Sequence, residues 1–197
     1  MTQILAPAKM TSSQRVARAI LRLVGWRVQD KLPDSKKYIL IGAPHTSNWD
    51  FVLMLLLRPA LGIRAHWAGK DTFFRWPWGA LLRKMGGIPV NRRSRNNFVD
   101  QIVEAFRQQE EMILVIAPEG TRSMSGYWKS GFYYMALGAG VPIALGFLDY
   151  ERRVGGVGAT LMPTGDIQTD FAVIREFYAG ITGRHPHGQG EIKLRDA

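Results

Sequence analysis

A histidine and an aspartate five residues apart are the first residues of this sequence whose types and spacing suit joint chemistry. His45 and Asp50 lie in the stretch IGAPHTSNWDF, residues 41–51, where one apolar run ends and another begins. An imidazole with an ordinary pKa of about 6.5 can accept the proton of an alcohol as the alcohol attacks. A carboxylate on the other ring nitrogen would fix the tautomer and favour the imidazolium. The pair is therefore a candidate general base with its orienting acid.

The same stretch also has an architectural interpretation, because residues 47–50 carry the pattern of a helix start. Asp50 would then be a first-turn acid that suits the helix dipole, and His45 would be an ordinary loop residue. A His-x4-Asp pattern is too short to decide between the two interpretations.

Strands alternate with helices in the pattern of the chain. Apolar runs and a glycine-rich stretch predict strands over residues 38–44, 63–69, 88–93, 112–123 and 141–150, and a strand pair over 154–166. Helical periodicity and helix-end signals predict helices over residues 11–28, 51–59, 78–87, 96–109, 131–140 and 170–181. This alternation predicts an α/β fold, a single domain with a largely parallel central sheet flanked by helices.

Polar side chains follow the ends of these predicted strands. His45 follows one strand, Lys70 another and Arg92 a third. Glu119 and Arg122 follow a fourth. Because ligand groups gather at the carboxyl ends of strands in such sheets, we expect these residues to converge on one site.

The residues that are absent exclude several classes of function. With no cysteine in the chain, disulfides, cysteine nucleophiles and cysteine-based zinc or iron–sulfur sites are excluded. No Gly-x-Ser-x-Gly or Gly-x4-Gly-Lys-Ser/Thr motif occurs, which disfavours an α/β-hydrolase serine and a P-loop. The stretch RHPHG, residues 184–188, has no acidic neighbours and is interpreted as a polar tail. We predict no metal and no cofactor.

The charge balance points to an anionic partner. The chain has 26 Lys and Arg against 16 Asp and Glu, a net charge of +10, together with six tryptophans. Tryptophan and basic residues together favour a lipid interface, so we expect an anionic membrane surface rather than nucleic acid. A charge that only keeps the protein soluble is the alternative. The basic stretch NRRSR, residues 91–95, is better explained by phosphate binding at a strand end than by RNA or DNA.

The predicted helix over residues 11–28 is amphipathic. Thr11 and Gln14 have capping-box spacing. One face carries the apolar residues Val16, Ile20, Leu23 and Val24. Another face carries the arginines Arg15, Arg18 and Arg22. This pattern is typical of a helix at a membrane surface, and also of a helix packed on its domain with a solvated basic face.

We expect residues 1–30 to form this N-terminal membrane-surface segment and residues 31–197 to form the catalytic domain. The N-terminus has no signal-peptide pattern. The longest charge-free stretch, Ser130–Leu148, is divided by Gly138, Gly140 and Pro142, so no transmembrane span is expected. We therefore expect a peripheral protein on the cytoplasmic face of a membrane.

Four motifs in a fixed order add a family resemblance. His-x4-Asp is followed by GGIPVNR (86–92), PEGTRS (118–123) and VPI (141–143). Together they resemble the motifs of the glycerolipid acyltransferases, the family of 1-acylglycerol-3-phosphate acyltransferase. The resemblance covers about residues 38–148 and implies a glycerol-3-phosphate acyltransferase-like fold.

The resemblance implies a role for each matching residue. His45 matches the catalytic base of the family, Asp50 matches its partner, and Arg92 matches an arginine that contacts the phosphate of the acceptor. The acceptor-binding motif is matched by Glu119, Gly120, Thr121 and Arg122. Lys70 lies where the family often has a basic residue near the site. Physically, the planar fork of arginine suits a bidentate contact with phosphate.

Two points stay open at this stage. Glu119 either orients Arg122 or bonds to hydroxyls of the acceptor. Residues 89–91 read Pro-Val-Asn, where the family commonly has a bulky residue and an aspartate before its arginine. That departure leaves the head group of the acceptor undecided.

The resemblance implies transfer of an acyl chain from acyl-CoA or acyl carrier protein to the free hydroxyl of a lysophospholipid, most simply 1-acylglycerol-3-phosphate, in phospholipid biosynthesis. One alternative is an O-acyltransferase of the same family that acts on a lyso-aminolipid or another acceptor. A second alternative is a non-enzymatic basic module that binds membrane or RNA.

Overall fold

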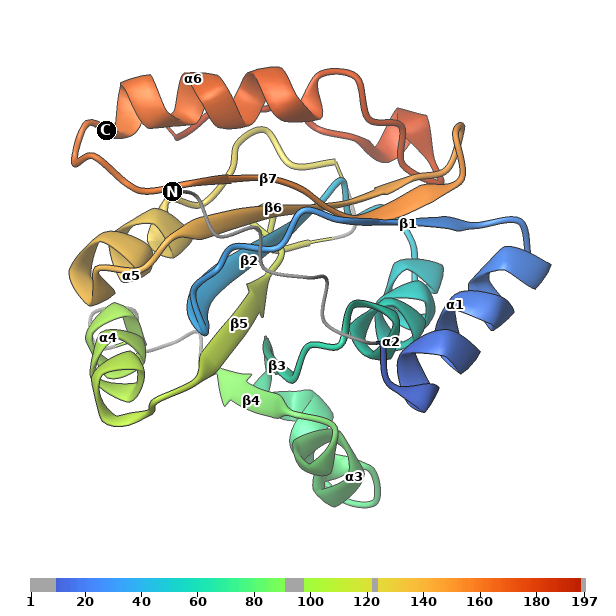
Figure 1. The fold of residues 1–197 in the computed structure, drawn as a ribbon. Coiled ribbons are helices and arrows are strands. Elements are labelled where there is room, and N and C mark those ends of the chain that lie inside the picture. Colours follow the sequence, from blue (N-terminus) through green and yellow to red (C-terminus); the bar gives the residue numbers. More distant parts are fainter. Residues whose placement is uncertain (1–9, 91–97, 122–123, 196–197) are drawn as a thin grey trace, which may run out of the picture.

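The computed structural model describes residues 10–90, 98–121 and 124–195, which form one α/β domain (Figure 1). Its seven-stranded sheet has the order β1-β7-β6-β2-β5-β3-β4. The strands are β1 (Arg27–Asp30), β2 (Lys37–Ala43), β3 (Ala65–Lys70), β4 (Gly87–Val90), β5 (Met112–Ile116), β6 (Ile143–Asp149) and β7 (Val154–Leu161). Neighbouring strands are parallel except β6 and β7, so the predicted largely parallel sheet is confirmed.

Helices cover both faces of the sheet. They are α1 (Ser12–Leu23), α2 (Trp49–Leu61), α3 (Gly79–Lys84), α4 (Phe98–Gln108), α5 (Gly131–Ala139) and α6 (Ile167–Tyr178), with short 3-10 turns η1 (Asp71–Phe74) and η3 (Pro186–Gly188). Figure 1 shows α6 on the opposite side of β6 and β7 from α1 and α2. Among the described residues, no helix is both long and apolar enough to cross a bilayer.

The central strand β2 is buried on both faces, as its unbroken apolar run predicts. Ile39 and Ile41 pack in the core that also receives α4, α5 and α6. Tyr38 and Leu40 pack in a second core beneath α1 and α2. Alternate residues of one strand thus join two helical layers to the sheet, and the carboxyl end of β2 is held from both sides.

The ends of the first two helices differ from the prediction. The first helix ends at Leu23, and residues 27–30 form β1 instead of continuing the helix, because Gly25 turns the chain with φ of 82°. Helix α2 passes Pro59 and ends at Leu61, before Gly62 in the left-handed conformation. Proline lacks the N–H for a bond to the carbonyl four residues earlier, and the helix ends two residues after it.

The glycine-rich stretch after β6 is one strand, not the predicted strand pair. β7 runs antiparallel to β6 and parallel to β1. A Cβ on Gly156 would lie 1.9 Å from the carbonyl oxygen of Gln29 in β1. The glycines there permit close approach of neighbouring backbones, whereas the sequence pattern had suggested a turn.

Candidate active site

His45 lies in the loop that joins β2 to α2, at the carboxyl end of the central strand. Its Nδ1 atom lies 3.0 Å from Oδ2 of Asp50 in the first turn of α2. The Asp50 side chain is 5% exposed, whereas 29% of the His45 side chain is open to solvent. The contact that the spacing allowed is present, with the imidazole partly accessible and its acid buried beneath it.

Asp50 is held by four hydrogen-bonding groups. Oδ2 accepts the backbone N–H groups of Thr46 and Ser47, each at 2.9 Å, as well as facing His45. Oδ1 accepts the hydroxyl of Tyr150 at 2.7 Å. The carboxylate therefore binds the backbone of the turn before α2 and also contacts the histidine. The catalytic-pair and helix-start interpretations of this stretch are thus compatible.

These contacts set the ionisation of the pair. Burial alone would raise the pKa of Asp50, but the hydrogen bonds from His45, Tyr150 and the Ser47 N–H outweigh burial and hold that pKa below its ordinary value. Asp50 is therefore a carboxylate at neutral pH and has no hydrogen to donate. Nδ1 of His45 must carry the hydrogen of their shared bond, which leaves the lone pair on Nε2. That nitrogen is the one able to accept a proton.

Tyr150 was not anticipated from the sequence. It follows β6, and its ring meets the ring of Trp26 edge-on, with centroids 5.0 Å apart. Burial, together with the bond to Asp50, raises the pKa of its hydroxyl well above the ordinary range, so the group stays a donor. No local pattern marks this tyrosine, because its partner lies 100 residues earlier in the chain.

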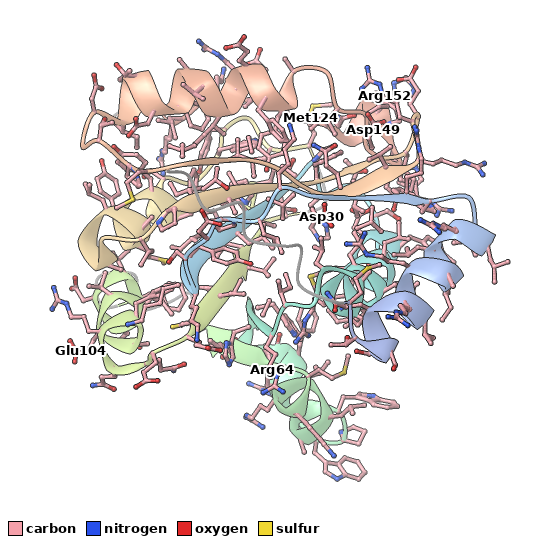
Figure 2. All side chains as sticks on the ribbon, viewed as in Figure 1. Asp30, Arg64, Glu104, Met124, Asp149 and Arg152 are labelled. Atoms are coloured by element: carbon pink, nitrogen blue, oxygen red, sulfur yellow. The ribbon has the colours of Figure 1, made fainter. Side chains whose placement is uncertain are left out.

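The turn that carries Tyr150 is braced by an acid and an arginine, Asp149 and Arg152, which lie together in Figure 2. Oδ1 of Asp149 accepts the N–H groups of Glu151 and Arg152 at 3.1 and 3.0 Å. Arg152 donates to Oδ2 of Asp149 and to the carbonyl of Gly180, both at 2.7 Å. This bracing ties the turn to the chain segment just after α6.

Glu119 has a partner that the sequence did not suggest. Its side chain is buried, and Oε2 accepts the backbone N–H of His45 at 2.9 Å. Burial raises its pKa and the nearby charge of Asp50 adds to that, while the N–H bond offsets part of the rise. Glu119 therefore positions the backbone of the loop that presents His45.

The rest of the predicted acceptor motif is described only in part. Gly120 has φ of 67°, and a Cβ there would lie 2.6 Å from Nζ of Lys129, so the position favours glycine. Thr121 is exposed beside it. Lys70 ends β3, but its side chain, like all of Arg92 and Arg122, lies outside what the structure describes. Phosphate contacts by these three basic residues stay predictions.

Arg184, which the sequence analysis did not assign to the site, lies beside two aromatic residues that flank Asp50. The guanidinium carbon of Arg184 is 5.3 Å from the ring centroid of Trp49 and 6.0 Å from that of Tyr150. The next residue, His185, donates its backbone N–H to Oγ1 of Thr46 at 3.1 Å. The stretch RHPHG thus closes over the histidine loop, although its composition had suggested only a polar tail.

Comparison with known proteins agrees with this geometry. A sequence model of the family described as Acyltransferase matches residues 24–144. This chain belongs to the Acyltransferase family. The resemblance to glycerolipid acyltransferases is confirmed, and the match spans His45, Asp50 and Glu119. Tyr150 and Arg184 lie beyond it.

The acyltransferase also resembles a solved structure, the 1-acyl-sn-glycerophosphate (LPA) acyltransferase PlsC from Thermotoga maritima. The TM-score is 0.58 at 15% sequence identity, over 86% of this chain and 77% of that chain. At such identity the likeness shows a shared fold alone. A search of curated proteins found no significant match.

Proposed function

We propose that this acyltransferase transfers an acyl chain from a thioester of coenzyme A or acyl carrier protein to the free hydroxyl of a lysophospholipid, most simply 1-acylglycerol-3-phosphate. The observation that carries the proposal is the 3.0 Å contact between Nδ1 of His45 and Oδ2 of Asp50. Family membership supports acyl transfer in lipid synthesis. The structural neighbour is an acyltransferase for LPA, which supports this choice of acceptor.

The proposed reaction proceeds in two steps without an acyl-enzyme. Nε2 of His45 accepts the hydroxyl proton while the oxygen attacks the thioester carbonyl carbon, which forms a tetrahedral oxyanion. As the carbonyl re-forms, the carbon–sulfur bond breaks and the leaving thiolate takes the proton back from Nε2. Asp50 stabilises the imidazolium between these steps. Positioned base catalysis of this kind contributes about a hundredfold to ten-thousandfold in rate, and the scheme uses no metal or cofactor.

On the family resemblance, Arg92 and Arg122 would hold the phosphate of the acceptor, with Lys70 nearby. Guanidinium groups on separate strand ends suit this task, because two bidentate contacts fix a phosphate in position and orientation. With the phosphate of the acceptor fixed in this way, its free hydroxyl would be directed toward Nε2 of His45.

Peripheral binding to an anionic membrane is part of the proposal, and α1 supports it. The helix packs on α2 through Ala17 and Leu21. Its apolar face is left in solvent, with Leu23 86% exposed. The other exposed apolar residues of that face are Val16, Ile20 and Val24. A stripe that the domain does not bury suits insertion between lipid head groups.

The arginines of α1 do not all serve the same surface. Arg18 pairs with Asp30 and donates through Nε to the carbonyl of Ala60 at 2.9 Å, so it helps fasten α1 to the domain. Arg15 and Arg22 are exposed. These two are the arginines of the helix available to anionic lipid.

A second exposed apolar surface follows β3, around η1 and α3. Trp76 is 93% exposed, and three further large apolar residues are exposed with it: Phe73, Trp78 and Leu81. Residues 72–99 contain six Lys and Arg and no Asp or Glu. Aromatic side chains suit the boundary between lipid head groups and acyl chains, and basic side chains complement the charge of an anionic bilayer.

Transfer of a radiolabelled acyl chain to a panel of lysolipids tests the function. Wild type, His45→Ala and the matched control His187→Ala, which changes an exposed histidine, are compared. We expect turnover with lysophosphatidate that falls about a hundredfold to ten-thousandfold in His45→Ala and persists in the control. A lyso-aminolipid as the best acceptor would instead indicate the alternative substrate. No turnover in any of the three proteins would indicate a binding module without catalysis, and equal turnover in all three would contradict the role of His45.

A further inference from the structure

Arg184 is a cation placed beside the reactive pair by residues that the family match does not include. Its guanidinium carbon lies 5.3 Å from the ring centroid of Trp49, the neighbour of Asp50 in the chain. The same carbon lies 6.0 Å from the ring centroid of Tyr150, whose hydroxyl bonds to Asp50. Tyr150 therefore links Arg184 to the acid that orients His45, and Trp49 precedes that acid in the chain.

The backbone around Arg184 is fixed to the histidine loop on both sides. His185 donates its N–H to Oγ1 of Thr46 at 3.1 Å. A Cβ on Gly183 would lie 3.0 Å from Cγ of Pro44 and 3.0 Å from Oγ1 of Thr46, so the chain approaches the loop closely at this glycine. The position of Arg184 is thus built into the fold and does not depend on a flexible tail.

The same segment is also braced from behind. Gly183 donates its N–H to Oε1 of Gln189 at 3.0 Å, and Nε2 of Gln189 donates to the carbonyl of Ile181 at 3.1 Å. Tyr150 donates its N–H to the carbonyl of Thr182 at 2.9 Å. These bonds join the loop before and after Arg184 to the turn that carries Tyr150.

The charge of Arg184 lies over two aromatic rings and beside the hydroxyl of Tyr150, to which its side chain also hydrogen-bonds. Among the ion pairs between described residues, none includes Arg184. Its side chain is exposed. These contacts hold the guanidinium in place, and because the group carries five N–H donors, it can bond a further group in addition to the Tyr150 hydroxyl.

We infer that Arg184 binds a phosphate group of a substrate at the entrance to the active site, in addition to the family-motif arginines. The inference rests on the proposed function, which supplies two phosphate-bearing molecules: the lysophospholipid and coenzyme A. A planar, exposed guanidinium with no acidic partner in the described part of the chain suits bidentate contact with a phosphate oxygen pair. Its place beside the Asp50 network puts that phosphate near the proton-accepting histidine.

Direct binding tests this inference without relying on turnover. Calorimetric titration of the full chain with coenzyme A and with a short-chain, water-soluble lysophosphatidate is compared among wild type, Arg184→Ala and Arg184→Lys. Arg175→Ala, which removes an equal charge from the exposed side of α6, is the matched control. Pantetheine and a short-chain monoacylglycerol serve as the corresponding ligands without the phosphate.

We expect Arg184→Ala to raise the Kd of one phosphate-bearing ligand about tenfold to a hundredfold, with a smaller rise in Arg184→Lys. If only lysophosphatidate binds more weakly, Arg184 contacts the phosphate of the lipid acceptor. If only coenzyme A binds more weakly, Arg184 contacts a phosphate of the acyl donor. In turnover, KM for that substrate should rise while kcat changes little.

The inference is overturned if neither phosphate-bearing ligand binds more weakly to Arg184→Ala than to Arg175→Ala. It is also overturned if the phosphate-free ligands weaken equally, or if wild type binds neither phosphate-bearing ligand. Intact, Arg184-dependent binding together with no acyl transfer would instead overturn the proposed function and leave the phosphate contact standing.

Discussion

The hydroxyl of Tyr150 donates a 2.7 Å hydrogen bond to Oδ1 of Asp50, while Oδ2 of the same carboxylate faces Nδ1 of His45 at 3.0 Å. One buried acid thus joins the end of β6 to the loop after β2. Because these strands are neighbours in the sheet, the bond locks the orientation of the acid from a second element.

Tyr150→Phe tests this positioning role. Phenylalanine keeps the edge contact with Trp26 but leaves Oδ1 of Asp50 without its hydroxyl donor. We expect kcat to fall about tenfold with little change in KM, because a lost hydrogen bond to a charged group loosens the pair. Steady-state kinetics measure this, with Tyr134→Phe, at an exposed position of α5, as the control. Unchanged kcat in Tyr150→Phe would show that His45 and Asp50 hold their geometry alone.

Asp50→Asn should change how stability depends on pH. The folded pKa of Asp50 lies below its ordinary value of 3.8, because hydrogen bonds outweigh burial. Its ionised form therefore contributes stability that is fully present above pH 3.8 and is lost as pH falls through the folded pKa. We expect Asp50→Asn to cost about 2 kcal/mol at pH 7 and less below pH 3.8. Urea denaturation of both proteins across this range measures the difference, and a constant difference would argue against an ionised acid.

Glu119 should show the opposite dependence. Burial raises its pKa above the ordinary 4.5, so the stability associated with its neutral form is present below pH 4.5 and is lost as pH rises through the folded pKa. Glu119→Gln keeps an oxygen for the His45 N–H and removes the charge. The melting temperature of Glu119→Gln, relative to that of wild type, should increase as pH rises from 4 to 7. Thermal melts at several pH values check this, and a gain that does not vary with pH would contradict it.

Glu119→Ala separates the hydrogen bond from the charge. It leaves the N–H of His45 without its described acceptor, which should cost about 1–3 kcal/mol and lower kcat. Glu119→Gln should retain more of the wild-type kcat than Glu119→Ala does. Equal kcat in the two variants would show that the acceptor oxygen is not what positions the loop.

Trp76→Ala combined with Trp78→Ala should weaken binding to membranes. Each change removes a large exposed apolar group from the basic surface around α3, so we expect at least about a tenfold loss of partitioning. Co-sedimentation with vesicles that contain anionic phosphatidylglycerol measures it, in low and high salt. Val173→Ser, on an exposed part of α6, is the control. Binding that equals the control would exclude this surface as a membrane contact.

Sequence reasoning reached the elements whose signals are local. An alternation of apolar runs and helical patterns is enough to predict an α/β fold. The apolar runs need helices on both faces of the sheet to bury them, and the helices between the strands provide that cover. His45 and Asp50 were identifiable because a single turn separates them. The capping box at Thr11 and Gln14 was likewise local, and both of its hydrogen bonds are present.

Orientation was harder to foresee. Periodicity predicted that α1 is amphipathic, but the domain buries the face with Ala17 and Leu21 and leaves the longer apolar stripe in solvent. The choice depends on which face meets α2, and there Ala17 leaves room for close packing while Leu21 fills the core. The polarity pattern of the sequence does not say how closely two helices approach, so it could not predict which face of α1 is buried.

By itself the sequence determined the strand–helix alternation, the His–Asp spacing and the excess of basic charge, because each is written in neighbouring residues or in the total composition. Only the tertiary structure decided that Tyr150 bonds to Asp50, that Glu119 holds the His45 backbone and that Arg184 lies over Trp49. The Glu119–His45, Tyr150–Asp50 and Arg184–Trp49 contacts join residues 74 to 135 positions apart. Strand order in the sheet brings such positions to one edge, and strand order follows from the packing of the whole chain.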